Sequence, residues 1–393
     1  MYKNMIYLGI CLSGKPYGGG TYQYNLSIIS ALKSLDCKKY KIIAFIYDDA
    51  WYQRLPDNFD VIKVSNPKYL KLLNRVYRFL DRTSEGVRRF SSFLNPMVKK
   101  INLSKCSLVI YPSQDAASYQ TNKKSLSTIH DLMHRYEGHF KEYQGRVKEK
   151  RDLHYSMMCK QVDGILVDSN VGKQHVIESY AIDESKIFVQ SFVPPMYLKR
   201  VANIDVRKKY KLPDQYFFYP AQFWEHKNHI NLLDAVKIIK NKGFDIHLVL
   251  AGSKENNYNQ VVSKIKNLEL IENISILGYV NDDEMASLYK NSIATVFVSF
   301  IGPTNIPPLE ALMLGCPLIC SNAYAMPEQT KGAALLVNPN NPKDIARKML
   351  IILNTEKTVA ANIGKGYEVI DKYGQDEFNK QLKKCIKKII IKH

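Results

Sequence analysis

The chain has 393 residues, of which 46% are hydrophobic and 24% charged, and this excludes a small disulfide-stapled module and an intrinsically disordered chain. Lysine and arginine total 56 against 37 for aspartate and glutamate, so the net charge is +19. The excess predicts an acidic partner, such as nucleic acid, anionic lipid or the phosphates of a nucleotide sugar.

The seven cysteines are scattered and form no CxxC pair. Their pattern predicts neither a disulfide framework nor a zinc site, and it favours a reducing cytoplasm. No stretch approaches the roughly 18 consecutive apolar residues of a membrane-spanning helix. We therefore expect a protein that is soluble or attached to a membrane surface.

Short apolar segments alternate with helix-length segments along the first half of the chain. The segments predicted as strands are residues 6–8, 42–47, 61–64, 108–111, 127–129, 165–167 and 187–189. Residues 22–35 and 142–161 are predicted helices. Continuous apolar strands that alternate with helices predict a parallel sheet covered on both faces.

The same alternation restarts after Pro194-Pro195. The strands predicted there are 216–219, 246–251, 274–278, 295–299, 318–320 and 334–337, and the helices are 230–242, 260–268, 283–290, 308–314 and 343–353. We predict two doubly wound, Rossmann-like α/β domains that face a cleft. The first spans residues 1–200 and the second 201–374. A last helix lies within 375–393, and its packing back on the first domain is left open.

Ligands of such sheets bind beyond the carboxyl ends of the strands. In the first domain, Gly18-Gly19-Gly20 precedes Thr21 in the first turn between strand and helix, where backbone amides can approach an anion or a sugar. A flexible loop is the alternative. His130-Asp131 ends a predicted strand and faces the expected cleft.

Two further histidines, His134 and His139, follow in a polar segment. Their spacing matches no metal-ligand pattern, so we interpret both as surface residues.

In the second domain, Lys227 directly precedes a predicted helix, where its ammonium group and the free amides can both meet a diphosphate. A solvated surface lysine is the alternative. Further along, the turn 302–305 leads into a helix that starts with Pro307-Pro308 and presents unpaired amides. Glu310 lies in the first turn of that helix, where a glutamate also favours the helix dipole.

These residues resemble the retaining glycosyltransferases of family 4, the glycosyl transferases group 1 type with the GT-B fold. The resemblance is densest over 216–340. Gln222 and Lys227-Asn228 are similar to the family's Arg-x4-Lys phosphate-binding turn, and residues 306–311 resemble the end of its Glu-x7-Glu motif. The segment 277–284 is similar to the strand and helix beside the nucleotide base.

The resemblance implies a role for each matching residue. Glu310 would hold the ribose hydroxyls of the donor, Lys227 would neutralise the leaving diphosphate, and His130 would lie beside the anomeric carbon. The acceptor or phosphate loop would comprise Gly18, Gly19, Gly20, Thr21 and Asp131. The other donor-binding residues would be Gln222, Tyr279, Gly302, Pro303, Thr304, Asn305 and Ile306.

The chain departs from the family pattern at two positions. Gln222 replaces the arginine and removes a positive charge, and Gly302 stands where the first glutamate is expected. Thr304 and Asn305 are candidates to replace the lost contacts. Because the chain has no Asp-x-Asp sequence, we expect an enzyme that needs neither metal nor other cofactor.

Basic residues gather in two segments, 68–100 and 383–392. The first is also rich in apolar side chains, which is typical of a basic amphipathic surface element that docks on an anionic membrane. A helix with a solvated basic face is the alternative.

We therefore expect a cytoplasmic or peripheral-membrane hexosyltransferase. It would move a sugar with retention from a nucleotide sugar to a glycan, lipid-linked in our interpretation, during synthesis of a polysaccharide such as O-antigen or capsule. The alternative is a non-catalytic relative that binds a nucleotide sugar or a partner transferase. Nucleic-acid binding has only the net charge in its favour, and we expect none.

Overall fold

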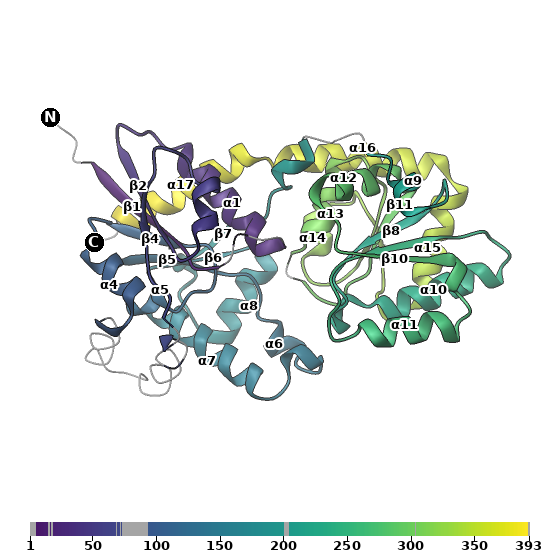
Figure 1. Ribbon diagram of the computed structural model, residues 1–393, viewed down its shortest axis with the longest axis horizontal. Helices are drawn as coiled ribbons and strands as arrows, with labels where there is room; N and C mark the ends of the chain where they lie inside the picture. Colours follow the sequence, from purple (N-terminus) through teal and green to yellow (C-terminus); the bar gives the residue numbers. More distant parts are fainter. Residues whose placement is uncertain are drawn as a thin grey trace. The chain divides into compact units, whose positions relative to one another are not determined.

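The computed structural model describes residues 5–14, 16, 19–67, 69, 70, 72, 93–199, 204–302 and 304–391. The chain divides into two compact units (Figure 1). Unit 1 comprises Met1–Leu132, Arg146–Ser191 and Gln375–His393, and unit 2 comprises Met133–Gly145 and Phe192–Gly374. Most of the basic segment 68–100 lies outside the described residues, as do Gly18 and Pro303.

Unit 1 is built on a seven-stranded parallel sheet in the order β3-β2-β1-β4-β5-β6-β7. The strands are β1 (Ile6–Leu12), β2 (Tyr40–Ile46), β3 (Asp60–Lys63), β4 (Leu108–Tyr111), β5 (Lys124–Ile129), β6 (Gly164–Val167) and β7 (Ile187–Val189). The inner strands β4 and β6 are buried at every residue and therefore on both faces, as continuous apolar strands require. The strand order reverses between β1 and β4.

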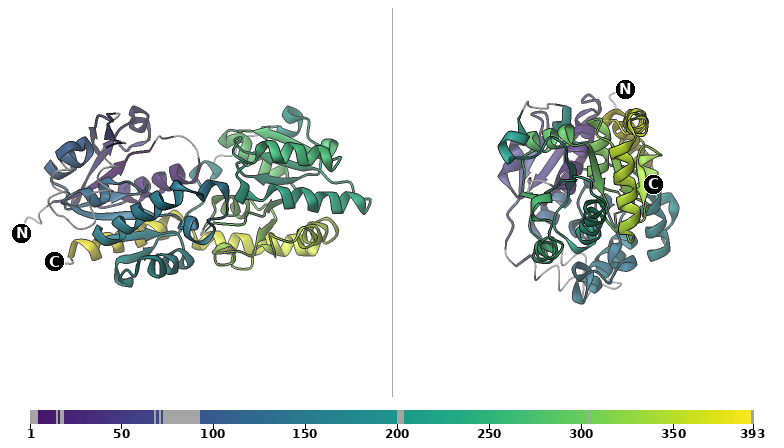
Figure 2. Two further views of the ribbon diagram at one scale, coloured as in Figure 1. Left: turned by 90° about the horizontal axis from the view of Figure 1, so that it is seen from below. Right: turned by 90° about the vertical axis from the view of Figure 1, so that its right-hand side faces the viewer.

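Helices cover the sheet of unit 1. They are α1 (Gly20–Lys33), α4 (Pro96–Leu103), α5 (Ala117–Gln120), α7 (Arg146–Gln161), α8 (Asn170–Tyr180) and α17 (Gln375–Ile391), with 3-10 turns η1 (Asp49–Arg54) and η3 (Glu184–Lys186). The last helix, α17, packs against α1 and β4, and Figure 2 shows it in yellow beside the purple α1. Gln375 at its start donates a hydrogen bond to the carbonyl of Ser27, 3.1 Å away.

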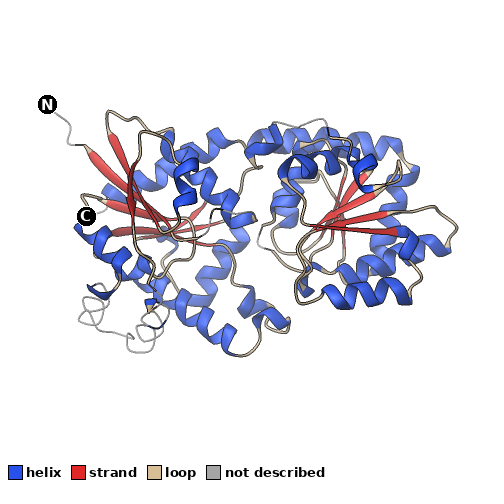
Figure 3. Ribbon diagram, in the orientation of Figure 1, coloured by secondary structure: helices blue, strands red, loops and turns tan. Residues whose placement is uncertain are grey.

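Unit 2 is built on a six-stranded parallel sheet in the order β10-β9-β8-β11-β12-β13, drawn in red in Figure 3. The strands are β8 (Phe217–Pro220), β9 (Leu248–Ala251), β10 (Ile274–Gly278), β11 (Ala294–Phe297), β12 (Leu318–Ser321) and β13 (Leu335–Val337). The strand order reverses between β8 and β11, and loops beyond the carboxyl ends of two such strands are where doubly wound sheets bind ligands.

The helices described in unit 2 are α6 (Met133–Tyr136), α9 (Val206–Tyr210), α10 (His229–Asn241), α11 (Tyr258–Asn267), α12 (Asp282–Asn291), α13 (Ile306–Met313), α14 (Met326–Thr330), α15 (Pro342–Asn354) and α16 (Glu356–Lys372). All of these except α6 contribute to one large core, and Met133 of α6 belongs to a smaller cluster. The 3-10 turns are η2 (Lys141–Tyr143), η4 (Met196–Lys199), η5 (Glu225–Lys227) and η6 (Ile271–Asn273).

The two parallel sheets with their helices confirm the predicted α/β class. One predicted helix, 142–161, has the wrong start. Residues 141–143 form the separate turn η2, and Gly145 then adopts a left-handed conformation with φ +61° before α7 begins at Arg146. No helix among the described residues is long and apolar enough to cross a membrane.

Candidate functional site

The turn η5 follows β8 and holds Lys227 at the strand switch of unit 2. Asn228 ends the turn in a left-handed conformation, φ +61°, which asparagine tolerates better than most residues. Its side-chain nitrogen Nδ2 donates to the backbone carbonyls of Val298, at 2.9 Å, and Pro339, at 2.7 Å. The Tyr219 hydroxyl donates to the carbonyl of Lys227. The backbone around Lys227 is therefore fixed by side chains from its own unit.

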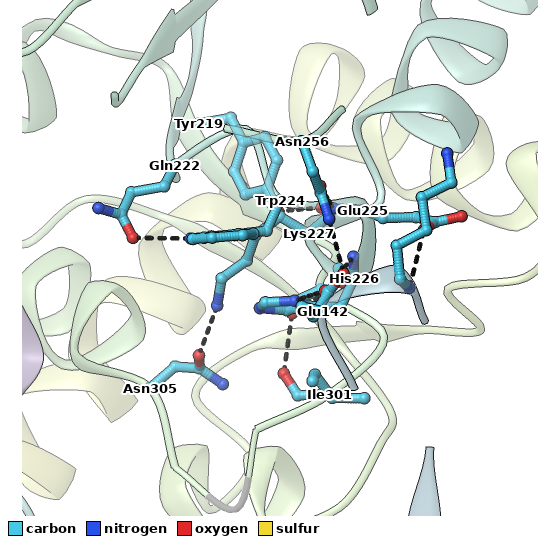
Figure 4. Close-up of polar contacts among 12 residues, drawn as sticks. Glu142, Tyr219, Gln222, Trp224, Glu225, His226, Lys227, Asn256, Ile301 and Asn305 are labelled. Carbon is cyan, nitrogen blue, oxygen red and sulfur yellow. Dashed lines mark hydrogen bonds and ion pairs between the residues drawn. The ribbon is translucent and has the colours of Figure 1, made fainter. Parts of the chain in front are cut away.

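The Lys227 ammonium group reaches the loop that follows β11 (Figure 4). Its Nζ donates to Oδ1 of Asn305 at 3.2 Å and lies 5.3 Å from the centroid of the Phe297 ring. Asn305 is the N-cap residue of α13, and its backbone is paired with Gln329 through two hydrogen bonds of 3.2 and 2.5 Å. A cation and a helix N-terminus thus meet, as in sites that bind phosphate.

Gln222 lies in the loop after β8, but its amide is occupied by neighbours. Its Oε1 accepts a hydrogen bond from Nε1 of Trp224 at 3.1 Å (Figure 4). Its Nε2 donates to Oγ of Ser253 at 3.0 Å. An amide carries no charge, so the phosphate attraction here depends on Lys227 and backbone dipoles.

The turn before α13 contains two buried polar atoms without a protein partner. Thr304 Oγ1 and Asn305 Nδ2 have no hydrogen-bond partner within the described part of the chain. Gly302 has φ +141°, and a Cβ built on it would lie 2.1 Å from Asn305 Nδ2. The amide of Asn305 therefore fills the space that a side chain at position 302 would need. Ile306, also predicted to be in this site, is buried at the first turn of α13.

Glu310 is buried in α13 with 7% of its surface exposed. Its Oε1 accepts from the hydroxyl of Tyr197 at 2.7 Å, and its Oε2 accepts from the hydroxyl of Tyr289 at 2.6 Å. Burial raises the pKa of Glu310, and the two tyrosine hydrogen bonds oppose that rise. Sequence reasoning missed both tyrosines, because neither lies in a recognisable motif.

Tyr279 follows Gly278 at the end of β10 and is 76% exposed. Such an exposed aromatic side chain at the carboxyl edge of a sheet is available to a ligand.

His130 follows β5 in unit 1 and lies between two hydrogen-bond acceptors. Its Nδ1 is 3.1 Å from a carboxylate oxygen of Asp168, and its Nε2 is 3.1 Å from the carbonyl of Pro112. Two acceptors are satisfied together only by the doubly protonated ring. Burial alone would lower the pKa of His130, but the charge and hydrogen bond of Asp168 outweigh burial and raise it.

The partner of His130, Asp168, was not predicted from the sequence. It follows β6 directly and is 2% exposed. Asp168 could have been predicted from its place as a polar residue at the end of β6, the strand next to β5, because the carboxyl ends of neighbouring parallel strands lie together. Asp131, the second residue of the predicted pair, binds Arg151 instead, at 2.7 Å.

Replacing Asp168 with asparagine is expected to lower the pKa of His130 below its usual value, because burial then acts without the opposing carboxylate. In the native protein the raised pKa means that protonated His130 stabilises the fold fully below about pH 6.5, the ordinary histidine value, and that this contribution is lost as the pH rises through the folded-state pKa. Histidine NMR titration of both proteins measures the shift. We expect a loss of about 1–3 kcal/mol in unfolding free energy for the variant at pH 5. Unchanged titration of His130 would contradict the assignment.

The glycine loop is described only in part. Gly19 adopts φ +83° and precedes α1, Gly20 is its first residue, and Thr21 is exposed in its first turn. Gly18 lies outside the described residues.

One interpretation of a histidine is wrong. His134, expected on the surface, is fully buried in α6, whereas the His139 side chain is 68% exposed and lies 3.3 Å from a carboxylate oxygen of Glu137. Polar composition around a short helix did not reveal its packing. Over the described ranges, no group of three or more His, Cys, Asp or Glu residues has the geometry to hold a metal ion.

Comparison with known proteins adds to this geometry. Residues 203–369 match the family described as glycosyl transferases group 1. The O-antigen chain mannosyltransferase RfbU of Salmonella typhimurium is 26% identical over 187 residues, which are 48% of this chain and 50% of that protein. The chain thus spans about half the length of such curated relatives.

Two solved structures share the fold over nearly the whole chain. A glycosyltransferase from Rickettsia africae has a TM-score of 0.71 at 20% identity and covers 99% of this chain and 100% of its own. The Anabaena protein HepE, solved with UDP and glucose, has a TM-score of 0.72 at 14% identity over 98% and 100%. The matched segment contains Lys227, the turn before α13 and Glu310. Residues 203–369, which contain these groups, are therefore similar to the glycosyl transferases group 1 family.

Proposed function

We propose that this protein is a glycosyltransferase that moves a sugar, with retention, from a nucleotide sugar to a glycan during synthesis of a cell-surface polysaccharide. The observation that carries the proposal is the Lys227 ammonium group held 3.2 Å from the N-cap residue of α13 in a matched family segment. The name of RfbU, an O-antigen chain mannosyltransferase, supports mannose as the sugar and O-antigen as the product class.

The chemistry required of the site is stabilisation of a departing diphosphate and of positive charge on the sugar. Lys227 supplies a cation, and the N-termini of α10 and α13 supply backbone dipoles that favour an anion. In this proposal Thr304 Oγ1 and Asn305 Nδ2 form hydrogen bonds with the donor, and Tyr279 contacts the base. Glu310 binds the ribose hydroxyls after the hydrogen bond from one of the two tyrosine hydroxyls to its carboxylate breaks.

His130 would lie beside the anomeric carbon. Both ring nitrogens of His130 face acceptors of the protein, an arrangement that favours the protonated ring over a ring that takes a proton from the acceptor hydroxyl. This supports a front-face reaction in which the leaving phosphate takes that proton. We further propose that no metal or other cofactor is needed, since Lys227 and the helix dipoles neutralise the charge of the departing diphosphate.

We also propose a cytoplasmic enzyme that attaches to the membrane surface and uses a lipid-linked acceptor. All seven cysteines are free thiols, as in a reducing compartment. On α17 the lysines are exposed while the apolar residues between them are buried. These lysines are Lys380, Lys383, Lys384, Lys387 and Lys388.

Replacing Lys384 and Lys387 with glutamate is expected to weaken binding to phosphatidylglycerol vesicles about tenfold or more, since each basic residue near an anionic surface contributes about 1 kcal/mol. Vesicle sedimentation at low and high salt measures the change. Lys357→Glu with Lys365→Glu on α16 alters the net charge equally and is the control. Equal binding by both double variants would contradict a docking role for α17.

A non-catalytic relative that binds a nucleotide sugar or a partner transferase is the second candidate. Two observations favour it: the amide of Gln222 is engaged within the protein, and Gly302 provides no carboxylate.

Incubation with UDP-, GDP-, dTDP- and ADP-sugars, mannosyl donors included, in the presence of EDTA separates the two candidates. A donor that raises the melting temperature and releases nucleoside diphosphate supports the transferase and its independence from metal. Stabilisation without release supports a non-catalytic relative that binds a nucleotide sugar. No stabilisation by any donor would overturn the transferase and favour a non-catalytic relative that binds a partner transferase.

A further inference from the structure

The segment 133–145 belongs to unit 2, although it comes shortly after His130 in the chain, a residue of unit 1. Phe140 stacks on Phe300 with ring centroids 5.6 Å apart, and both lie in one apolar cluster with Ile301. The Tyr324 hydroxyl donates a hydrogen bond to Glu137. Apolar packing and polar contacts therefore hold this segment on the loops around β8, β11 and β12.

Of the residues in this segment named here, Glu142 makes the most hydrogen bonds to the rest of unit 2 (Figure 4). Its Oε1 pairs with Nδ1 of His226 and accepts from the His226 backbone amide at 3.3 Å, and its Oε2 accepts from Nδ2 of Asn256 at 2.9 Å. Burial by itself would raise the pKa of Glu142, but the hydrogen bonds from His226 and Asn256 outweigh it and lower the pKa to about 2. The group is an anion throughout the physiological range.

The partners of Glu142 lead directly to Lys227. Asn256 Oδ1 accepts from the backbone amide of Glu225 at 3.0 Å, so Glu142 and Asn256 together secure the first two residues of η5. The carbonyl of His226 accepts from the Phe300 amide at 2.9 Å, which ties the same turn to the loop that leads to Asn305. Lys227 is the third residue of this three-residue turn.

We infer that Glu142 is a positioning residue that acts through His226 and Asn256 to hold η5 in the conformation that aims Lys227 at the donor diphosphate. The inference rests on the proposed function for its ligand. A largely buried carboxylate is the suitable group, because its two oxygens accept all three donors at once. An amide offers a single acceptor oxygen and leaves at least one donor unpaired. Nothing in the role requires Glu142 to touch the substrate.

Glu142→Ala and Glu142→Gln test the inference against a matched control, Glu137→Gln, which removes a contact of the same segment elsewhere on unit 2. Isothermal titration measures binding of whichever nucleoside diphosphate the native protein takes. We expect about tenfold weaker binding for Glu142→Ala, a smaller loss for Glu142→Gln, and native affinity for Glu137→Gln. Affinity for the corresponding nucleoside, measured by saturation-transfer NMR, should stay native in all three, because the nucleoside lacks the diphosphate.

Hydrogen exchange over residues 219–229 tests the positioning without any ligand. Faster exchange of the η5 amides in the Glu142 variants, but not in Glu137→Gln, is expected. Native exchange and native diphosphate affinity in Glu142→Ala would overturn the inference, as would equal losses for diphosphate and nucleoside. If the native protein binds no nucleoside diphosphate, the proposed function fails, while the exchange measurement still decides whether Glu142 holds the turn.

Discussion

Replacing Lys227 with alanine is expected to lower kcat by a factor of about 100 to 1000, the usual effect of removing one preorganised group that stabilises developing charge. Gln222 supplies no second cation to stabilise that charge, because its amide is neutral and forms hydrogen bonds with Trp224 and Ser253. Affinity for nucleoside diphosphate should fall as well. Release of nucleoside diphosphate from the cognate donor, measured at saturating acceptor, gives kcat, and isothermal titration gives the affinity for the nucleoside diphosphate.

Lys237→Ala is the matched control for this prediction. Lys237 lies on α10, the helix that follows the Lys227 turn, and its ammonium group faces Glu269 at 3.6 Å. Native kinetics are expected for that variant. Turnover within a factor of two of native in Lys227→Ala would remove Lys227 from the leaving-group site. Lys227→Arg should recover part of the activity, since the charge returns on a differently shaped group.

Gly302→Ala is expected to lower the unfolding free energy by more than a change in backbone preference alone. A residue with a Cβ at φ +141° costs about 1–3 kcal/mol. The new methyl group would also lie 2.1 Å from Asn305 Nδ2, and overpacking of this kind typically costs about 1–3 kcal/mol more. Denaturant unfolding of the full chain measures the sum.

Two further variants separate the backbone cost from the clash. Gly243 has φ +83°, and a Cβ added to it would meet no atom within 4 Å, so Gly243→Ala reports the backbone cost alone. Gly302→Ala combined with Asn305→Ala removes the clashing amide and should recover the packing part of the loss. If Gly302→Ala is no more destabilising than Gly243→Ala, the assignment of this space to Asn305 is wrong.

The sequence by itself determined the fold class and the position of the Lys227 turn. Apolar strand periodicity and helix length act locally, so the alternation in each half was sufficient to predict a parallel sheet covered by helices. The position of Lys227 directly before α10 and the turn before α13 could be predicted for the same reason, because strand, turn and helix are contiguous in the chain.

Only the tertiary structure decided which side chains meet across the chain. Asp168 reaches His130 from a neighbouring strand, and Tyr197 and Tyr289 reach Glu310 from 113 and 21 residues away. Glu142 lies 84 residues from His226, in a segment predicted as the start of a helix. Their pairing depends on desolvation and on distances set by folding, which composition and spacing do not encode. The buried His134 shows the same limit, because polar neighbours in sequence do not report which face of a short helix is covered.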